Sequence, residues 1–242
     1  KKLKKIDYII NCIGILNKDI DKNIPDAAAI NSLFPNKLAR WAEKNDCKII
    51  HVSTDAVFPP VAGSVCEKDM PEPIDLYGSS KFLGEPYSSR ALTIRTSIIG
   101  FDPIKKKGLL EWVANNKSGT LKGYTNQKWS GCTVLQFAIL CNDLIFNDKF
   151  DILRKSTRIF HFAPISGITK YEMVKSINKM FSGKKQVKKE KGQEINRILY
   201  SKFANLLKIK RFESTFSLAL KKLISFEHGK QEKTCIRSGH KA

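Results

Sequence analysis

Short apolar runs that alternate with helix-like segments are the feature that most constrains the fold. Residues 5–13 (KIDYIINCI), 47–52 (CKIIHV) and 91–99 (ALTIRTSII) are rich in Ile, Val and Leu, and each ends at a glycine or a polar turn. Runs of this kind are typical of parallel strands buried on both faces. A helical stretch opened by Pro25 separates the first two, and residues 76–85 form a predicted helix before the third. This alternation predicts an α/β fold with a parallel sheet wrapped by helices.

Beyond residue 100 the alternation is looser. The Lys-rich residues 182–192 predict a solvated connector, and residues 195–226 carry leucines at helical spacing. Thr169, with Glu172 three residues later, is typical of a helix start. The other predicted elements of this part are a strand at residues 158–163 and helices at residues 108–116, 133–147 and 169–181.

The charge of the chain is strongly basic. Lys and Arg number 43 and Asp and Glu 23, which gives a net charge of +20. The excess lies mainly after residue 150, where it could attract anions. An alternative is that Lys, Asn and Ile are simply abundant throughout the chain, without selection for anion binding. We favour this alternative and therefore expect no nucleic-acid partner.

Membrane and metal sites have little support in the sequence. No apolar run reaches the roughly 18–20 residues of a membrane span. The six cysteines are scattered without a C-x-x-C pair, and none of the four histidines lies near a cysteine or another histidine. We therefore expect free thiols in a reducing cytoplasm, no membrane span and no metal site.

Three polar motifs follow predicted strands or open a predicted helix: residues 11–14, Ser53-Thr54-Asp55, and Tyr77 with Lys81. Ligands of parallel sheets bind at the carboxyl ends of the strands. Tyr77 and Lys81 are four residues apart, so on a helix they share a face. A nearby cation lowers the pKa of a phenol, and Thr54 could hydrogen-bond the carbonyl that Tyr77 protonates. Alone, the Tyr–Lys spacing also fits an ordinary exposed pair; the order of the motifs favours catalysis.

With these motifs the chain resembles the extended short-chain dehydrogenase/reductase superfamily, and within it most closely the dTDP-4-dehydrorhamnose reductase family. The resemblance covers about residues 5–180. It implies a Rossmann-type sheet with a smaller α+β region, a nicotinamide cofactor (NADPH or NADH) and a nucleotide-sugar substrate. The segments that carry it are DYIINCIG (7–14), AINSLFPNKLA (29–39), IHVSTDAVF (50–58), LYGSSKFLGE (76–85), LTIRTSIIG (92–100) and NQKWSGCT (126–133).

The resemblance also implies site residues and a division of the chain. Residues 1–100 would be the C-terminal half of a cofactor-binding Rossmann domain, 101–228 a substrate-binding region and 229–242 a polar tail. Trp129 could face the sugar or base, or equally lie in the core. The implied catalytic residues are Thr54, Tyr77 and Lys81. The implied cofactor-binding residues are Cys12, Ile13, Gly14, Asn31, Ser53, Tyr77 and Lys81, and the implied substrate-binding residues are Thr54, Asp55, Ala56, Val57, Ser97, Ile98 and Trp129.

Two departures from the family pattern matter. The sequence holds no Gly-rich dinucleotide turn, neither G-x-G-x-x-G nor G-x-x-G-x-x-G. We therefore expect the chain to start at the family's fourth strand, as a fragment or as a form that has lost the cofactor, and to bind a dinucleotide weakly by itself. The second departure is Ala56, which supplies no acid for eliminating water and argues against a dehydratase.

The leading hypothesis is NADPH-dependent reduction of a nucleotide-linked 4-keto-6-deoxy-sugar, in deoxysugar and cell-surface polysaccharide precursor biosynthesis. An epimerase of the same superfamily would use the same three residues. A non-catalytic, reductase-like binding subunit is the third hypothesis, favoured by the missing turn and opposed by the intact Thr–Tyr–Lys set. A homodimer is compatible with all three.

Overall fold

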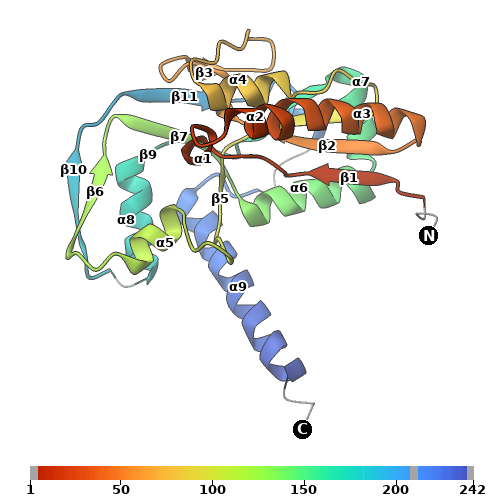
Figure 1. Cartoon of the computed structure of the whole chain (residues 1–242). Coiled ribbons are helices and arrows are strands. Elements are labelled where there is room, and N and C mark those ends of the chain that lie inside the picture. Colours follow the sequence, from red (N-terminus) through yellow and green to blue (C-terminus); the bar gives the residue numbers. More distant parts are fainter. Residues whose placement is uncertain (1–4, 182, 208–211, 239–242) are drawn as a thin grey trace.

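The computed structural model describes residues 5–181, 183–207 and 212–238. One of its sheets consists of four parallel strands, of which β1 (Tyr8–Asn11) and β2 (Lys48–Ser53) are labelled on the right of Figure 1. The strands are, in spatial order, β1, β2, β4 (Ala91–Arg95) and β8 (Ile159–His161). In the register of the sheet, Ile50 of β2 lies between Ile10 and Leu92, and Ile94 pairs with Phe160. The α/β class and the parallel sheet predicted from the sequence are confirmed.

Helices cover both faces of this sheet: α3 (Phe34–Lys44) covers one, and α6 (Val134–Phe146) and α7 (Lys149–Ser156) cover the other. Ala42 of α3 packs with Ile49, while Leu140 of α6 packs with Leu92. Because neighbouring residues of a strand point to opposite faces, the apolar runs of β2 and β4 supply both cores. This burial on two sides explains why β2 and β4 are mostly apolar. Strand β1 was also predicted to be buried on both faces, but it lies at the edge of the sheet and is only partly buried, with Ile10 42% exposed.

The helical stretch that Pro25 opens is interrupted by a wider turn. It runs from α2 (Ile24–Ala27) through the π-helical segment η1 (Ala28–Leu33) into α3. Asn23 caps its start by accepting a hydrogen bond from the backbone N–H of Asp26 at 3.1 Å. Short π-helical segments often occur at functional sites, and this one turns the buried Asn31 inward. Helix α4 (Leu76–Leu83) lies beside this π-helical segment, and the short helix α1 (Asn17–Ile20) lies next to α4.

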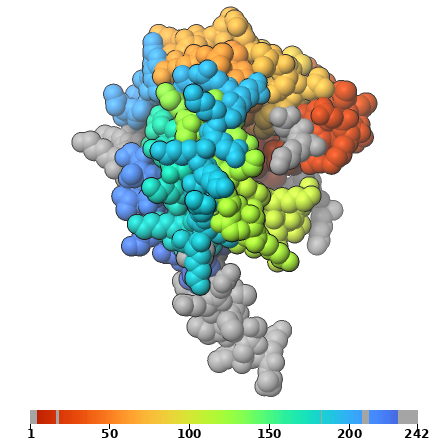
Figure 2. Space-filling model, turned by 90° about the vertical axis from the view of Figure 1, so that its left-hand side faces the viewer, coloured from red at the N-terminus to blue at the C-terminus, as the bar shows by residue number. Residues whose placement is uncertain are grey.

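A second group of strands forms the other part of the molecule. The larger sheet has the order β3 (Gly63–Val65), β11 (Ile195–Leu199), β7 (Gln127–Thr133) and β5 (Ile98–Ile99), with β9 (Ile165–Thr169) antiparallel to β7. A parallel pair, β6 (Thr120–Tyr124) and β10 (Gln186–Glu190), lies next to it. Figure 2 looks onto this part of the molecule, where the green to blue segments, from β6 to β11, lie together below the orange part of the chain that contains β3.

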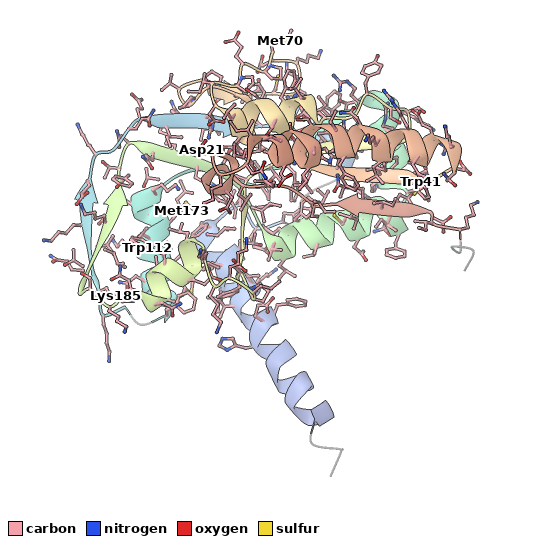
Figure 3. All side chains as sticks on the ribbon, viewed as in Figure 1. Asp21, Trp41, Met70, Trp112, Met173 and Lys185 are labelled. Carbon is pink, nitrogen blue, oxygen red and sulfur yellow. The ribbon has the colours of Figure 1, made fainter. Side chains whose placement is uncertain are left out.

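Three helices pack on these strands: α5 (Leu109–Asn115), α8 (Lys170–Phe181) and α9 (Phe216–Ser238). Met173 of α8, labelled in Figure 3, belongs to the apolar core they share. Lys185, also labelled there, donates hydrogen bonds to the carbonyls of Val113 and Ala114 at 2.6 and 3.0 Å, at the C-terminal end of α5. A cation at this end of a helix is favourable.

Several sequence-based boundaries differ from the structure. Residues 186–190, predicted to be a connector, form β10, and residues 195–199, predicted to be helical, form β11. The predicted strand at 91–99 is divided between two sheets as β4 and β5. Strand β8 lies within residues 101–228 yet joins the first sheet, so the two predicted regions share a sheet. The predicted tail begins inside α9, and residues 239–242 lie outside the described residues.

Candidate active site

The loop after β1 is held by two buried asparagines. Asn11 accepts a hydrogen bond from the backbone N–H of Ile13 at 3.2 Å, and its Nδ2 lies 3.1 Å from Nδ1 of His51. Asn31, from η1, accepts from the backbone N–H of Ile15 at 2.8 Å and donates to the Ile15 carbonyl at 2.9 Å. Burial and the Lys81 charge lower the pKa of His51 to about 3, so its imidazole is neutral.

Asn31 also links this loop to α4. Its Nδ2 donates to Oγ of Ser80 at 3.0 Å. Gly14 lies in the same corner: a Cβ there would be 3.3 Å from Oδ1 of Asn31 and 3.7 Å from Nζ of Lys81. Gly14, Asn31 and Lys81, which the sequence analysis assigned to cofactor binding, therefore lie together. Cys12 and Ile13 lie exposed beside them.

Thr54 and Tyr77 meet because the turn after β2 and the start of α4 pack closely. Thr54 caps the short 3₁₀ helix η2 (Asp55–Val57) by accepting from the backbone N–H of Ala56 at 3.1 Å. Asp75 caps α4 by accepting from the backbone N–H of Gly78 at 2.6 Å. A Cβ on Gly78 would lie 2.2 Å from the carbonyl oxygen of Ala56, so only a glycine permits this approach. The Thr54 hydroxyl lies close enough to Tyr77 to lower the pKa of the phenol.

Lys81 is buried one turn along α4 from Tyr77. Its Nζ donates a hydrogen bond to the carbonyl of Val52 at 2.7 Å, and the residue is 5% exposed. Burial lowers its pKa from 10.5 to about 8, although the charges of Glu85 and Cys12 act in the opposite direction. The ammonium therefore sits close to its titration point at neutral to mildly alkaline pH.

We expected the Lys81 charge to lower the pKa of Tyr77, but in the structure this pKa is raised. Burial raises the pKa of Tyr77 above its usual value of 10.0, and the nearby Thr54 hydroxyl acts against this. The charged side chains with the largest influence on its pKa are Asp55 and Asp75, which raise it, and Arg197, which lowers it. Desolvation of the phenol therefore outweighs the attraction of a cation that we expected to lower this pKa.

Ser53 points away from the loop after β1 toward a buried ion pair. Its Oγ donates to Oε1 of Glu85 at 2.7 Å, and Glu85 also accepts from Nε of Arg95 at 2.8 Å. Arg95 Nη1 lies 3.5 Å from Nε2 of His161, whose pKa burial lowers to about 4. The hydroxyl of Ser53 is thus engaged in the protein interior, and its contact with a cofactor stays a prediction.

The predicted substrate residues are divided between surface and core. Ala56 and Val57 are buried, whereas Ile98 is 41% exposed. Trp129 is 9% exposed; its Nε1 donates to Oγ of Ser97 at 2.8 Å and its ring packs edge-on against Phe216. The structure thus has Trp129 in the core, the second of the two alternatives that the sequence left open.

Arg197 is a site residue that the sequence analysis did not find. It lies on β11, and its Nε donates to Oδ2 of Asp55 at 3.1 Å while Nη1 donates to the carbonyl of Phe58 at 3.1 Å. Its segment was predicted to be helical, and nothing in the local sequence signals that Arg197 faces the turn after β2. The contact depends on the fold of the whole chain.

The residues present fit one half of a nicotinamide dinucleotide. Tyr77 and Lys81 offer a hydroxyl and an ammonium for ribose hydroxyls, and Gly14 leaves the space beside Asn31 and Lys81 free of a side chain. The 242 residues contain no Gly-rich turn for a pyrophosphate. Within residues 5–181, 183–207 and 212–238 there is neither a cluster of three His, Cys, Asp or Glu that could hold a metal ion nor a helix long and apolar enough to cross a membrane.

A parallel sheet with Thr54, Tyr77 and Lys81 at its carboxyl edge defines a sugar-nucleotide reductase fold of the short-chain dehydrogenase/reductase type. The model of the RmlD substrate binding domain family matches residues 2–224. The chain belongs to this family, which confirms the resemblance seen in the sequence.

Known proteins with similar sequences and structures agree with this assignment. A probable low-salt glycan biosynthesis reductase of Haloferax volcanii is 32% identical over 133 residues, 50% of this chain and 44% of that protein. Methionine adenosyltransferase 2 subunit beta of Pongo abelii is 28% identical over 185 residues, 72% and 54% of the two chains. The chain thus spans about half the length of these relatives. A hypothetical dTDP-4-dehydrorhamnose reductase of Sulfolobus tokodaii has a similar structure (TM-score 0.68, 28% identity, 86% of this chain and 75% of the other).

Proposed function

We propose that the protein reduces the keto group of a nucleotide-linked 4-keto-6-deoxy-sugar with NADPH or NADH. The close packing of α4 against the turn after β2, which places Tyr77 beside Thr54 and Lys81 on the Val52 carbonyl, carries this proposal. Carbonyl reduction develops negative charge on the keto oxygen, and that oxygen must be bound by donors and protonated. A phenol and a hydroxyl that lie near each other at the carboxyl edge of the sheet support both tasks.

The nicotinamide, when bound, supplies a hydride to the keto carbon. Tyr77 donates its proton to the keto oxygen, and Thr54 donates a hydrogen bond to the same atom. Because burial raises the pKa of Tyr77, the phenol stays protonated at neutral pH, as a proton donor must. Lys81, fixed on the Val52 carbonyl, would hold the ribose hydroxyls of the bound cofactor.

Reduction is favoured over elimination of water at this site. The residue after Asp55 is Ala56, which is buried and has no acidic group. Removal of water from a hexose needs an acid at the leaving hydroxyl. Of the two carboxylates that influence Tyr77, Asp55 is paired with Arg197, and Asp75 caps α4 by accepting from the backbone N–H of Gly78. An epimerase would use the same three residues and remains the alternative within the superfamily.

We place this reaction in the cytoplasm, in the supply of deoxysugar precursors for cell-surface polysaccharides. Free thiols persist in a reducing compartment. The described cysteines, all free, are Cys12, Cys47, Cys66, Cys132 and Cys141.

A non-catalytic binding subunit is the second candidate function. Its support is the similarity to a protein named as a subunit of a methionine adenosyltransferase, which extends over more of this chain than the similarity to the Haloferax reductase. Under this alternative the site would bind a nucleotide without turnover.

The test is oxidation of NADPH by the full-length protein in the presence of a dTDP-linked 4-keto-6-deoxy-sugar. Tyr77→Phe should lower the rate by about 10²–10⁴, the usual contribution of a general acid, with the fold and the cofactor Kd little changed. Tyr87→Phe is the matched control, because the ring of Tyr87 is 87% exposed and lies outside the site. Normal turnover by Tyr77→Phe would contradict the assignment. Nucleotide binding without turnover by the parent protein would favour the binding subunit.

A further inference from the structure

Arg197 brings the second sheet into contact with the turn that follows β2. It stands on β11, paired with Gly63 of β3, and its guanidinium reaches two groups of the first part of the chain. These are Oδ2 of Asp55 at 3.1 Å and the carbonyl oxygen of Phe58 at 3.1 Å. The side chains of Arg197 and Asp55 are 17% and 18% exposed, so the pair is largely shielded from water. A shielded pair is weakened little by salt.

We propose that Arg197 is a positioning residue of the reductase site: by holding the Asp55 carboxylate, it frees the Thr54 hydroxyl to act on a substrate carbonyl and keeps Tyr77 an effective acid. This inference rests on the proposed function and adds a residue from a sheet that does not carry the Thr–Tyr–Lys set.

The first step of the argument concerns the single proton of Thr54. Its Oγ1 accepts from the backbone N–H of Ala56 at 3.1 Å and donates to Oδ1 of Asp55 at 3.2 Å. A hydroxyl has one proton to donate, so a proton given to Asp55 is withheld from a keto oxygen. The ion pair with Arg197 draws negative charge to the other oxygen, Oδ2, and makes Oδ1 a weaker competitor. The geometry therefore favours release of the Thr54 proton toward substrate.

The second step concerns the charges around Tyr77. Asp55 of η2 and Asp75 at the start of α4 raise its pKa, and Arg197 of β11 lowers it. Lys81, on the same face of α4, is held by the Val52 carbonyl. Loss of the Arg197 charge would leave two carboxylates facing the phenol without this compensation. The phenolate would be less stable, and Tyr77 would become a poorer proton donor.

A purely structural role for Arg197 makes a different prediction. If Arg197 only tied η2 to β11 through Phe58, its replacement would lower stability without changing how Tyr77 titrates. Arg197→Lys keeps the positive charge but cannot reproduce both hydrogen bonds of the planar guanidinium. Arg197→Gln keeps a donor and removes the charge. These two variants separate the charge from the structural tie.

The experiment measures the Tyr77 phenol directly, by ¹⁹F NMR of the full-length protein labelled with 3-fluorotyrosine, whose phenol titrates at lower pH than that of tyrosine. Tyr77→Phe assigns the resonance. Arg197→Gln should raise the pKa of residue 77 by roughly half a unit or more, and Arg197→Lys by less. Adding Asp55→Asn to Arg197→Gln should return the pKa toward that of the parent. In turnover, Arg197→Gln should lower kcat about tenfold with little change in KM.

Arg158→Gln serves as the control, since Arg158 stacks on the exposed ring of Tyr87 outside the site. An unchanged Tyr77 titration in a folded Arg197→Gln protein that still turns over would overturn the inference and leave the proposed function standing. If Arg197→Gln shifts the Tyr77 titration but the parent protein has no reductase activity, the proposed function is overturned, and the positioning role with it.

Discussion

Arg95 and Glu85 form a buried ion pair directly behind the turn that carries Thr54. Nη2 of Arg95 lies 2.7 Å from Oε2 of Glu85, and the two side chains are 1% and 2% exposed. Glu85 also accepts from Ser53, so one carboxylate joins the end of β2, the end of α4 and β4. Inside a protein each charge of an ion pair depends on the other, because no water is present to solvate a charge that has lost its partner.

Removing one member of this pair should therefore destabilise the protein strongly. We expect Glu85→Ala to lower the free energy of unfolding by about 3–5 kcal/mol, the usual cost of leaving a buried charge without its partner. Urea denaturation followed by circular dichroism measures it. Lys122→Ala, which breaks an exposed pair with Glu190, should change stability little. Equal effects of the two variants would show that the interior pair is not special.

The predictable part of the fold was the part with buried parallel strands. Residues 47–52 and 91–95 are rich in apolar side chains on both faces and could be recognised without tertiary information. Strand β10 could not, because its sequence QVKKE is polar and only Val187 faces the core beside Leu121 of β6. Strand β11 was predicted to be helical because it begins a segment, residues 195–226, that carries leucines at helical spacing. Whether such a segment forms a strand or a helix depends on pairing with a strand distant in the sequence. A local sequence pattern carries no information about that pairing.

Gly84 approaches Asn31 so closely that a side chain has no room. A Cβ on Gly84 would lie 1.8 Å from the carbonyl oxygen of Asn31. The backbone of Gly84 is in the right-handed helical region, so alanine is unstrained there and the contact alone decides the outcome. We expect Gly84→Ala to separate α4 from η1 and to destabilise the protein by about 1–3 kcal/mol or more, as overpacking does.

Gly119→Ala is the matched control for this variant, because no heavy atom lies within 4 Å of the Cβ position at residue 119. Thermal unfolding of both variants measures the difference. A Gly84→Ala protein as stable as Gly119→Ala would mean that α4 and η1 can move apart freely.

Which residues meet in the candidate site was predicted in part. The spacing of Tyr77 and Lys81 on one helix and the position of Thr54 at a strand end were enough to expect those three together. The pKa of Tyr77 was not predictable, because it depends on how deeply α4 packs against η2, which Gly78 permits. Arg197 was not predictable either, since it lies 142 residues from Asp55 along the chain.

Because Lys81 is buried, the free energy of unfolding changes with pH in the alkaline range. Its pKa is about 8 in the folded protein and 10.5 in the unfolded chain. Below pH 8 both states carry the proton, and burying the charge costs the full penalty. Between pH 8 and 10.5 the unfolded chain binds more protons, so stability rises with pH. The shift corresponds to about 3 kcal/mol.

Lys81→Met should remove this dependence. The free energy of unfolding of the parent protein minus that of Lys81→Met should grow by about 3 kcal/mol as the pH rises from 7 to 10.5, because the parent loses its penalty and the variant has none. Urea denaturation at a series of pH values measures the difference, in which the titration of the other shared groups cancels. Loss of the hydrogen bond to Val52 lowers the stability of the variant at every pH and does not alter this slope. Lys122→Met, at an exposed position, should give a difference that does not change with pH. A constant difference for Lys81→Met as well would mean that Lys81 keeps its proton throughout and is solvated in the folded protein.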